Sequence, residues 1–122
     1  MANWSVERDL FARRLVYKTT PITLSFGAGE TEKSISLFGN CLIHTIKVLI
    51  ANWTNPVTLT LTVVDPDGDT IYTSDALAPD TFNAITGLKD LIAIWGTCTL
   101  VFTLSGAPGG SGGDVVSSVY CI

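Results

Sequence analysis

The chain has 122 residues, which is the size of one domain, and a chain of this length buries roughly two thirds of its unfolded surface, enough for a core. Hydrophobic residues make up 47% and charged residues 15%, which excludes a disordered or highly charged protein. With 7 basic and 11 acidic residues the net charge is -4, so a groove that neutralises phosphates is hard to build and nucleic acid is not an expected partner.

The first fifteen residues interleave charged and apolar side chains, and Ser5 with Glu7 could start a short helix. We expect an N-terminal arm over residues 1–15 and a single β-sandwich domain over residues 16–122. Charges at 7–9 interrupt any apolar run, so no secretory signal is expected, and we expect the protein to be made and kept on the cytoplasmic side or to leave by lysis. The residues of the arm that we select as interface candidates are Trp4, Leu10, Phe11, Arg13 and Arg14.

Apolar and polar residues then alternate with a period of two, which is typical of half-buried antiparallel strands. The expected strand at 57–63 places threonines toward water, and the expected strand at 42–51 is more apolar and suits the centre of a sheet. The residues predicted to face inward are Ile22, Leu24, Phe26, Ile35, Leu37, Leu42, Ile46, Val48, Ile50, Val57, Leu59, Leu61, Val63, Cys98, Leu100, Phe102, Leu104, Val115, Val119 and Cys121, with Ser117 on the same face of the last strand.

Turn signals separate these strands, and the clearest is the proline-aspartate-glycine turn at 65–68. Residues 76–90 mix helix formers with proline and glycine, and we expect a long connection that crosses from one sheet to the other. The uncharged run at 91–107 is shorter than the ~20 apolar residues of a membrane span and alternates in its second half, so it predicts a strand and no membrane association. The pattern predicts an all-β fold, an antiparallel β-sandwich of jelly-roll or Greek-key type.

The chain has three cysteines, Cys41, Cys98 and Cys121, and an odd number cannot pair completely within one chain. At least one thiol is therefore free or bridges two chains, and a disulfide framework is disfavoured. We interpret the cysteines as small buried hydrophobic residues. Since no C-x-x-C spacing is present and His44 is the single histidine, no metal site is expected.

The glycine-rich stretch LSGAPGGSGGDVV at 104–116 differs from a phosphate-binding loop. Such a loop needs a lysine and a serine or threonine after its last glycine, and Asp114 stands there instead. We expect a flexible hairpin that joins two strands. Asp65, Asp67 and Asp69 resemble a calcium loop, but the glycine precedes the third acid and alanine occupies the twelfth place, so a tight turn is predicted.

The sequence offers no convincing catalytic residues. His44 lies in an apolar strand beside Leu42 and Ile46, whereas catalytic bases usually lie in polar clefts. Most aspartates fall in turns, where this residue is expected. We therefore expect no enzyme activity, no cofactor and no small-molecule substrate. Trp53, in a turn, is a candidate exposed ring for contact with a partner or a sugar, while Trp95 is expected in the core.

The second half, from VTLTLTVVDPDGDTIYTSDALAPDTFNA through LVFTLSGAPGGSGGDVVSSVYCI, resembles small virion proteins of tailed bacteriophages. The shared elements are a strand ending in a D-x-D-G turn that leads to I-Y-x-S, and a late L-x-G-A-x-G-G-x-G-G loop before a valine-rich strand ending in tyrosine. The resemblance covers residues 57–122 and implies a capsid decoration or cement protein, or a small head-tail or tail component. It implies partners in the major capsid protein and copies of the chain itself, often as trimers, at the capsid surface. A carbohydrate or host-surface binding module displayed on the particle is the alternative, and pairing of Cys41, Cys98 or Cys121 between chains is left open.

Overall fold

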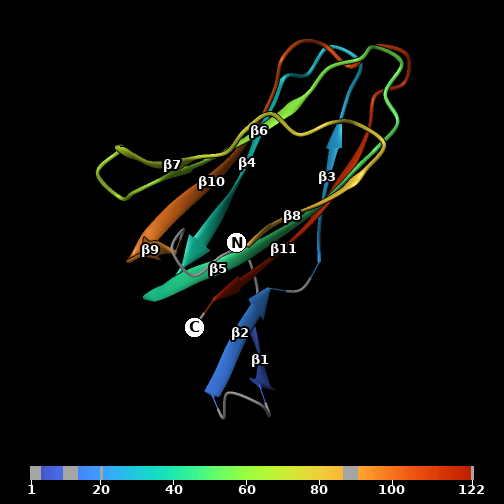
Figure 1. Ribbon diagram of the computed structural model, residues 1–122. Coiled ribbons are helices and arrows are strands. Elements are labelled where there is room, and N and C mark those ends of the chain that lie inside the picture. Colours follow the sequence, from blue (N-terminus) through green and yellow to red (C-terminus); the bar gives the residue numbers. More distant parts are fainter. Residues whose placement is uncertain (1–3, 10–13, 20, 87–90, 122) are drawn as a thin grey trace.

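A computed structural model of the protein describes residues 4–9, 14–19, 21–86 and 91–121, and these residues form an all-β fold without a helix. Two antiparallel sheets lie against each other as a sandwich, as the alternation predicts (Figure 1). The strands are β1 (Trp4–Asp9), β2 (Arg14–Thr19), β3 (Ile22–Phe26), β4 (Glu32–Phe38), β5 (Cys41–Ile50), β6 (Leu59–Val64), β7 (Thr70–Thr73), β8 (Phe82–Thr86), β9 (Ile92–Ile94), β10 (Thr97–Leu104) and β11 (Gly113–Cys121).

The larger sheet has seven strands and follows the order β1-β2-β11-β5-β8, with β3 paired to β11 and β9 paired to β5. The smaller sheet has the order β4-β10-β6-β7. Most connections of the sandwich cross between the sheets. Strands that follow one another in the chain often belong to different sheets: β3, β5, β9 and β11 lie in the larger sheet, and β4, β6 and β10 lie in the smaller one. No helix among the described residues is long and apolar enough to cross a membrane.

The core lies between the sheets and confirms the period-two prediction. Leu59, Leu61 and Val63 of β6 are fully buried, as are Leu100 and Phe102 of β10. In β11 the predicted residues 115, 117, 119 and 121 all face inward. The threonines between the apolar residues of β6 are partly exposed, which is the expected pattern for a strand with one solvent-exposed face.

The prediction for β5 is wrong at its start. Leu42 is 39% exposed, whereas Ile43 is buried and so are the consecutive residues Thr45 and Ile46. The register with β11 shifts here, because Tyr120 pairs with Thr45 and Cys121 pairs with Ile43. This irregularity inserts one extra residue at position 44, as in a β-bulge, and reverses the faces of the residues before it.

Two predicted connections differ from expectation. The glycine-rich stretch joins β10 of the smaller sheet to β11 of the larger one, so it is a crossing between sheets and not a hairpin. The segment 76–90 crosses from β7 to the larger sheet as predicted, but it also contains β8, which pairs with β5. The turn at 65–68 is confirmed, since the N–H of Gly68 donates to the carbonyl of Asp65 at 3.0 Å.

The N-terminal segment forms a β-hairpin, so the suggested helix at its start is wrong. β1 pairs with β2 along its whole length, and the backbone of β2 joins β11 at residues 17 and 18 (Figure 1). At the end of β2 the buried Thr19 accepts a hydrogen bond from the N–H of Val119 through its Oγ1, at 2.9 Å. The hairpin is thereby attached to the final strand. A division between arm and domain at residue 15 falls within β2, and we retain it as a proposal.

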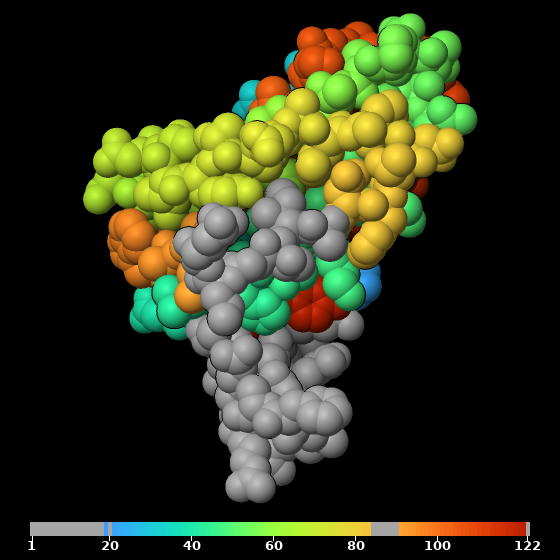
Figure 2. All heavy atoms as spheres, in the orientation of Figure 1, coloured from blue at the N-terminus to red at the C-terminus, as the bar shows by residue number. Residues whose placement is uncertain are grey.

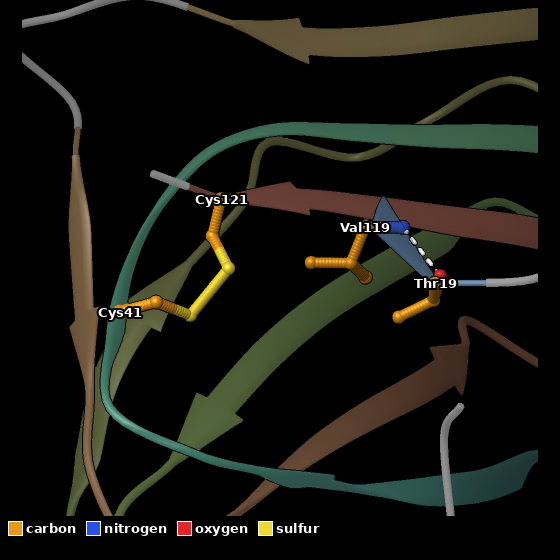
Figure 3. The surroundings of a disulfide bond; sticks show 4 residues. All are labelled: Thr19, Cys41, Val119 and Cys121. Carbon is orange, nitrogen blue, oxygen red and sulfur yellow. Dashed lines mark hydrogen bonds between the residues drawn. A yellow bond between two sulfur atoms is a disulfide. The ribbon is translucent and has the colours of Figure 1, made fainter. Parts of the chain in front are cut away.

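Cys41 and Cys121 form a disulfide within the chain, which corrects the interpretation of these two cysteines as unbonded, small buried hydrophobic residues and leaves neither of them for a bond between chains (Figure 3). The bond joins the first residue of β5 to the last residue of β11, with Cα atoms 5.9 Å apart. The two cysteines are 80 residues apart in sequence, but the pairing of β5 with β11 brings them together. Cys98 is a free, fully buried thiol, as predicted.

Candidate contact surface

Exposed apolar side chains gather where β4 leads into β5 and β9 leads into β10. Ile92 and Ile94 of β9 point into the core, so the alternation turns Ala93 and the following Trp95 outward, and Trp95 is 44% exposed. Leu42 pairs with Ala93 across β5 and β9 and is also exposed. Phe38, at the end of β4, is 54% exposed. We call Phe38, Leu42, Ala93 and Trp95 the corner surface.

Backbone contacts hold the two turns of this corner together. The N–H of Gly39 donates to the carbonyl of Gly96 at 3.0 Å, and the N–H of Gly96 lies 3.3 Å from Oδ1 of Asn40. Gly96 has φ +58, a conformation that glycine adopts without strain. Trp95 is therefore held next to a hydrogen-bonded turn.

A hollow of about 390 Å³ adjoins the corner surface. Its lining comes from β7 in the smaller sheet and from β9 and its flanks in the larger sheet: Ile71, Tyr72, Leu91, Ile92, Ala93 and Trp95. Two aromatic side chains thus border one open hollow at the edge of the sandwich, a composition that suits an apolar or ring-shaped group.

Acidic side chains stand beside the corner surface. The β6–β7 turn carries Asp67 and Asp69, both exposed, and Asp65 at its base. Oδ1 of Asp65 accepts hydrogen bonds from the N–H groups of residues 67 and 69, each at 2.9 Å, so this carboxylate shapes the turn. A Cβ placed on Gly96 would lie 3.3 Å from Cγ of Pro66, which puts the acidic turn against the corner. Figure 2 shows the turn, in yellow-green, projecting over the orange β9–β10 corner at the left.

A second apolar area lies on the outer face of the larger sheet. Leu49 of β5 is 51% exposed and Phe82 of β8 is 60% exposed, and the two residues are paired in register. Val116 of β11 pairs with Leu49 from the other side. Farther along the same face, Nζ of Lys47 lies 4.9 Å from the centroid of the Tyr120 ring. The outer face therefore combines an apolar row with a cation–π pair.

Trp53 does not belong to either surface, and the prediction of an exposed ring is wrong. The side chain is 5% exposed, packs edge-on against Phe26 at 6.0 Å between ring centroids, and donates from Nε1 to the carbonyl of Val57 at 3.2 Å. Burial of the indole is possible because its N–H finds a partner inside. Trp95 was expected in the core and is exposed, so the predictions for both tryptophans are wrong.

The glycine-rich loop is held at the opposite end of the sandwich, near Trp53. Asn55 donates from its backbone N–H to the carbonyl of Pro108 at 2.9 Å and from Nδ2 to the carbonyl of Ala107 at 2.9 Å. The N–H of Gly109 donates to the carbonyl of Ala28 at 3.0 Å. These bonds tie three loops together, so this stretch works as a structural crossing.

An ion pair lies at the β3–β4 turn of that end, between Glu30 and Lys33. The carboxylate of Glu30 accepts a hydrogen bond from the N–H of Gly27 and lies 3.0 Å from Nζ of Lys33, and these contacts lower the pKa of Glu30 below its ordinary value. The carboxylate is exposed to solvent, so the pair shapes the β3–β4 turn without forming an enclosed charged site.

The remaining predicted residues are placed as follows. His44 lies at the irregularity in β5, with Nδ1 2.8 Å from Oγ1 of Thr45, in the middle of the sheet as its apolar surroundings predict. Trp4 begins β1 and Arg14 begins β2. Leu10, Phe11 and Arg13 lie outside the described residues, so the contact role predicted for the arm is untested. In the described part of the chain no group of three metal-binding side chains occurs.

Comparison with known proteins identifies the fold. No protein-family model matches the chain, and no curated protein matches it in sequence. Among solved structures, a chain of the acidic stable capsid structure of Helicobacter pylori bacteriophage KHP30 is similar, with a TM-score of 0.52 and 13% identity. The match covers 100% of this chain and 94% of that one. The two proteins share a fold.

Two weaker similarities were found. A chain in the structure of infectious bursal disease virus Gx strain has a TM-score of 0.41 and 18% identity, and the match covers 88% of this chain but 32% of the viral one. The CBM22-1 xylan-binding domain from Paenibacillus barcinonensis Xyn10C has a TM-score of 0.40 and 14% identity, over 100% of this chain and 81% of that domain.

Proposed function

We propose that this chain is a structural virion protein of a tailed bacteriophage, and specifically a capsid decoration or cement protein that stabilises the head lattice by bridging subunits. Its proposed partners are the major capsid protein and copies of itself, arranged as a homotrimer. It acts at the capsid surface after synthesis in the host cytoplasm, through surface contacts and without catalysis. A small head-tail or tail component is the alternative within the same class.

The observation that carries this proposal is the full-length match to a chain of a bacteriophage capsid structure. Both chains are nearly completely covered, so the likeness concerns the full length of this chain and not a shared submotif. The D-x-D-G turn and the late glycine-rich loop add an independent resemblance to small virion proteins of tailed phages.

The exposed apolar residues support a role in assembly. Among the residues whose burial the structure describes, five large hydrophobic side chains are exposed, at the corner surface and on the outer face of the larger sheet: Phe38, Leu42, Leu49, Phe82 and Trp95. Clustered apolar exposure commonly marks a protein interface. On a lattice, many weak contacts of this kind combine into stable attachment.

A carbohydrate or host-surface binding module is the second candidate. Trp95 and Tyr72 border one hollow, and aromatic rings of this kind can stack on sugar rings. This candidate now rests on Trp95, because Trp53 is buried. Binding to a glycan array that is lost in Trp95→Ala and kept in Phe82→Ala would favour it over the assembly role.

Quantitative mass spectrometry of purified particles tests the main proposal. We expect the chain to sediment with the heads at a copy number comparable to that of the major capsid protein. A copy number of about a dozen or fewer would place it at the neck or tail. Absence of the chain from washed particles would refute a structural role in the virion.

A further inference from the structure

The hollow lies on a side of the sandwich that the connection 74–81 closes at one end. Within this connection Leu77 exchanges backbone hydrogen bonds with Leu59 of β6. Farther along, the carbonyl of Thr81 accepts from the N–H of Ile50 in β5, so the connection reaches both sheets. At the other end the hollow lies between β7 of the smaller sheet and β9 of the larger one, both at the left in Figure 1. The hollow is thus the part of this side that the connection does not close.

The lining of the hollow is apolar and reaches the core. Ile92 belongs to the core, and Ile71 and Tyr72 pack against it. Ile71 and Tyr72 are consecutive but both line the hollow, and the pairing of β7 with β6 explains this. Tyr72 and Thr70 pair with consecutive residues of β6, which leaves one extra residue at position 71. A regular strand would place that side chain on the opposite face, whereas a β-bulge can turn it into the hollow.

Backbone groups on both rims of the hollow face outward. The residue that follows Thr73 donates its N–H to the carbonyl of Leu61, so the alternation of an antiparallel ladder turns the N–H and C=O of Thr73 away from β6. In the register of β5 with β9, the N–H of Gly39 donates to the carbonyl of Gly96, so the same alternation turns the backbone groups of Ala93 away from β5. No described strand pairs with these outer edges of β7 and β9. Such outward groups can bind the main chain of an extended polypeptide.

The charges around the hollow have one sign. The exposed residues Asp67 and Asp69 precede β7, and the exposed Asp75 follows it, so carboxylates stand at both ends of this edge strand. The described stretches 48–86 and 91–121, which include β6, β7, β9 and β10, contain no lysine or arginine. No basic side chain of these strands neutralises the carboxylates, and an acidic rim of this kind attracts a cationic partner.

We infer that the hollow is the docking site for an extended segment of a partner protein. One apolar side chain of that segment enters the hollow beside Trp95. The main chain of the segment bonds to the outward backbone groups on the rims, and a neighbouring lysine or arginine faces Asp67 and Asp69. Under the proposed function the partner is the major capsid protein, so the inference rests on that function and specifies how the two proteins contact each other.

The lining favours an apolar side chain over a sugar ring. A bound sugar needs several polar partners for its hydroxyl groups, because buried polar groups without hydrogen bonds are costly. Among the described side chains of the hollow, polar atoms come from the phenol of Tyr72 and the indole of Trp95, and the others are aliphatic. A peptide segment can instead take its hydrogen bonds from the backbone of the rims, while its apolar anchor fills the hollow.

A synthetic peptide tests the chemistry of the site with the isolated full-length chain. The probe is the fluorescein-labelled peptide Lys-Thr-Leu-Thr-Phe-Thr-Lys, whose lysine, leucine and phenylalanine side chains share one face when it is extended. It should bind at least roughly tenfold more tightly than the same peptide with glutamate in place of both lysines, measured by fluorescence anisotropy at low salt. No binding at ~1 mM, or equal binding of the two peptides, would overturn the inference.

Variants locate the binding on the chain. Trp95→Ala and the double variant Asp67→Asn/Asp69→Asn should each raise the dissociation constant of the probe at least roughly fivefold. The matched control Asp80→Asn/Asp114→Asn removes the same charge from exposed positions outside the lining of the hollow and should change the constant by less than about twofold. All of these side chains are exposed, so each variant should keep the Tm of the wild type. Equal effects of the two double variants would show a general effect of charge and contradict the docking site.

Photo-cross-linking in purified particles tests the identity of the partner. Trp95→p-benzoylphenylalanine places a photoreactive ring at the hollow, and Ser111→p-benzoylphenylalanine, at an exposed position on the glycine-rich loop, is the matched control. Mass spectrometry should find position 95 linked to a segment of the major capsid protein that has a lysine or arginine within about three residues, roughly 10 Å of extended chain. Linkage to an acidic segment, to a second copy of this chain, or equally from position 111 would refute the inference.

The outcomes separate the inference from the proposed function. A chain that is present in washed particles but gives no link from position 95 refutes the docking site and leaves the virion role in place. A chain that is absent from particles but binds the probe through Trp95 and the two aspartates refutes the virion role and keeps the docking site. Binding of a glycan in place of the probe, lost in Trp95→Ala, would favour the carbohydrate candidate and overturn the inference.

Discussion

Replacing Cys41 and Cys121 by alanine should remove a large part of the stability of this fold. The disulfide fastens the last residue of β11 to the first residue of β5, and it closes a loop over a sequence separation of 80 residues. A covalent loop of that length restricts the unfolded chain much more than the folded one.

The size of the effect follows from the loop length. The chain-entropy relation gives about 4.5 kcal/mol for a loop of this size, and measured losses for native disulfides are about 2–5 kcal/mol. For a domain of this length, the loss corresponds to a fall in Tm of roughly 10–20 °C.

The fall in Tm is measured by thermal unfolding followed by circular dichroism, with and without a phosphine reductant. Wild type should lose stability on reduction, and the double alanine variant should match reduced wild type and not respond to the reductant. Cys98→Ala is the control for loss of a thiol without loss of the bond, and it should keep the response to reduction. A wild type whose Tm is unchanged by reduction, with three thiols titrated in the untreated denatured chain, would refute the disulfide.

Three further predictions concern stability, measured by urea unfolding. Trp53→Ala should cost about 3–5 kcal/mol because it empties part of the core, whereas Trp95→Ala should stay within about 0.5 kcal/mol; the reverse order would contradict the placement of the two rings. Gly112→Ala should cost more than about 2 kcal/mol, since φ is +73 and the new Cβ would overlap the carbonyl of the last residue of β3; Gly29→Ala meets open space and should be nearly neutral. Asp65→Ala should cost roughly 1–2 kcal/mol by removing the acceptor for two backbone N–H groups of the β6–β7 turn, and an unchanged midpoint would count against that role.

The sandwich could be predicted because its strands are half buried. Where one face packs and the other is wet, as in β6 and β11, alternation in the sequence records burial directly. The same argument failed at Leu42, because the register shift opposite Tyr120 is set by pairing with a strand about 75 residues later and leaves no local signal. β8 was not predicted for a related reason. Its five residues are too few to show a clear alternation of apolar and polar side chains, and pairing with β5 makes them a strand.

The candidate contact surface was harder to predict than the fold. A residue in a turn, such as Trp53, is expected to be exposed from its sequence position. In the fold, packing against Phe26 buries it. Trp95 lies in an apolar run, and its exposure becomes clear once the inward positions of Ile92 and Ile94 are fixed. Pairing of Cys41 with Cys121 depends on the neighbouring positions of β5 and β11, which sequence spacing does not reveal.

The central claim is that this β-sandwich acts through its contact surfaces as a repeated component of a phage capsid. An electron cryomicroscopy reconstruction of purified particles tests it most directly. The account predicts density for this fold at regular positions on the head, in contact with the major capsid protein. A head reconstruction without such density, together with a soluble monomer that binds a small ligand in the hollow beside Trp95, would contradict it.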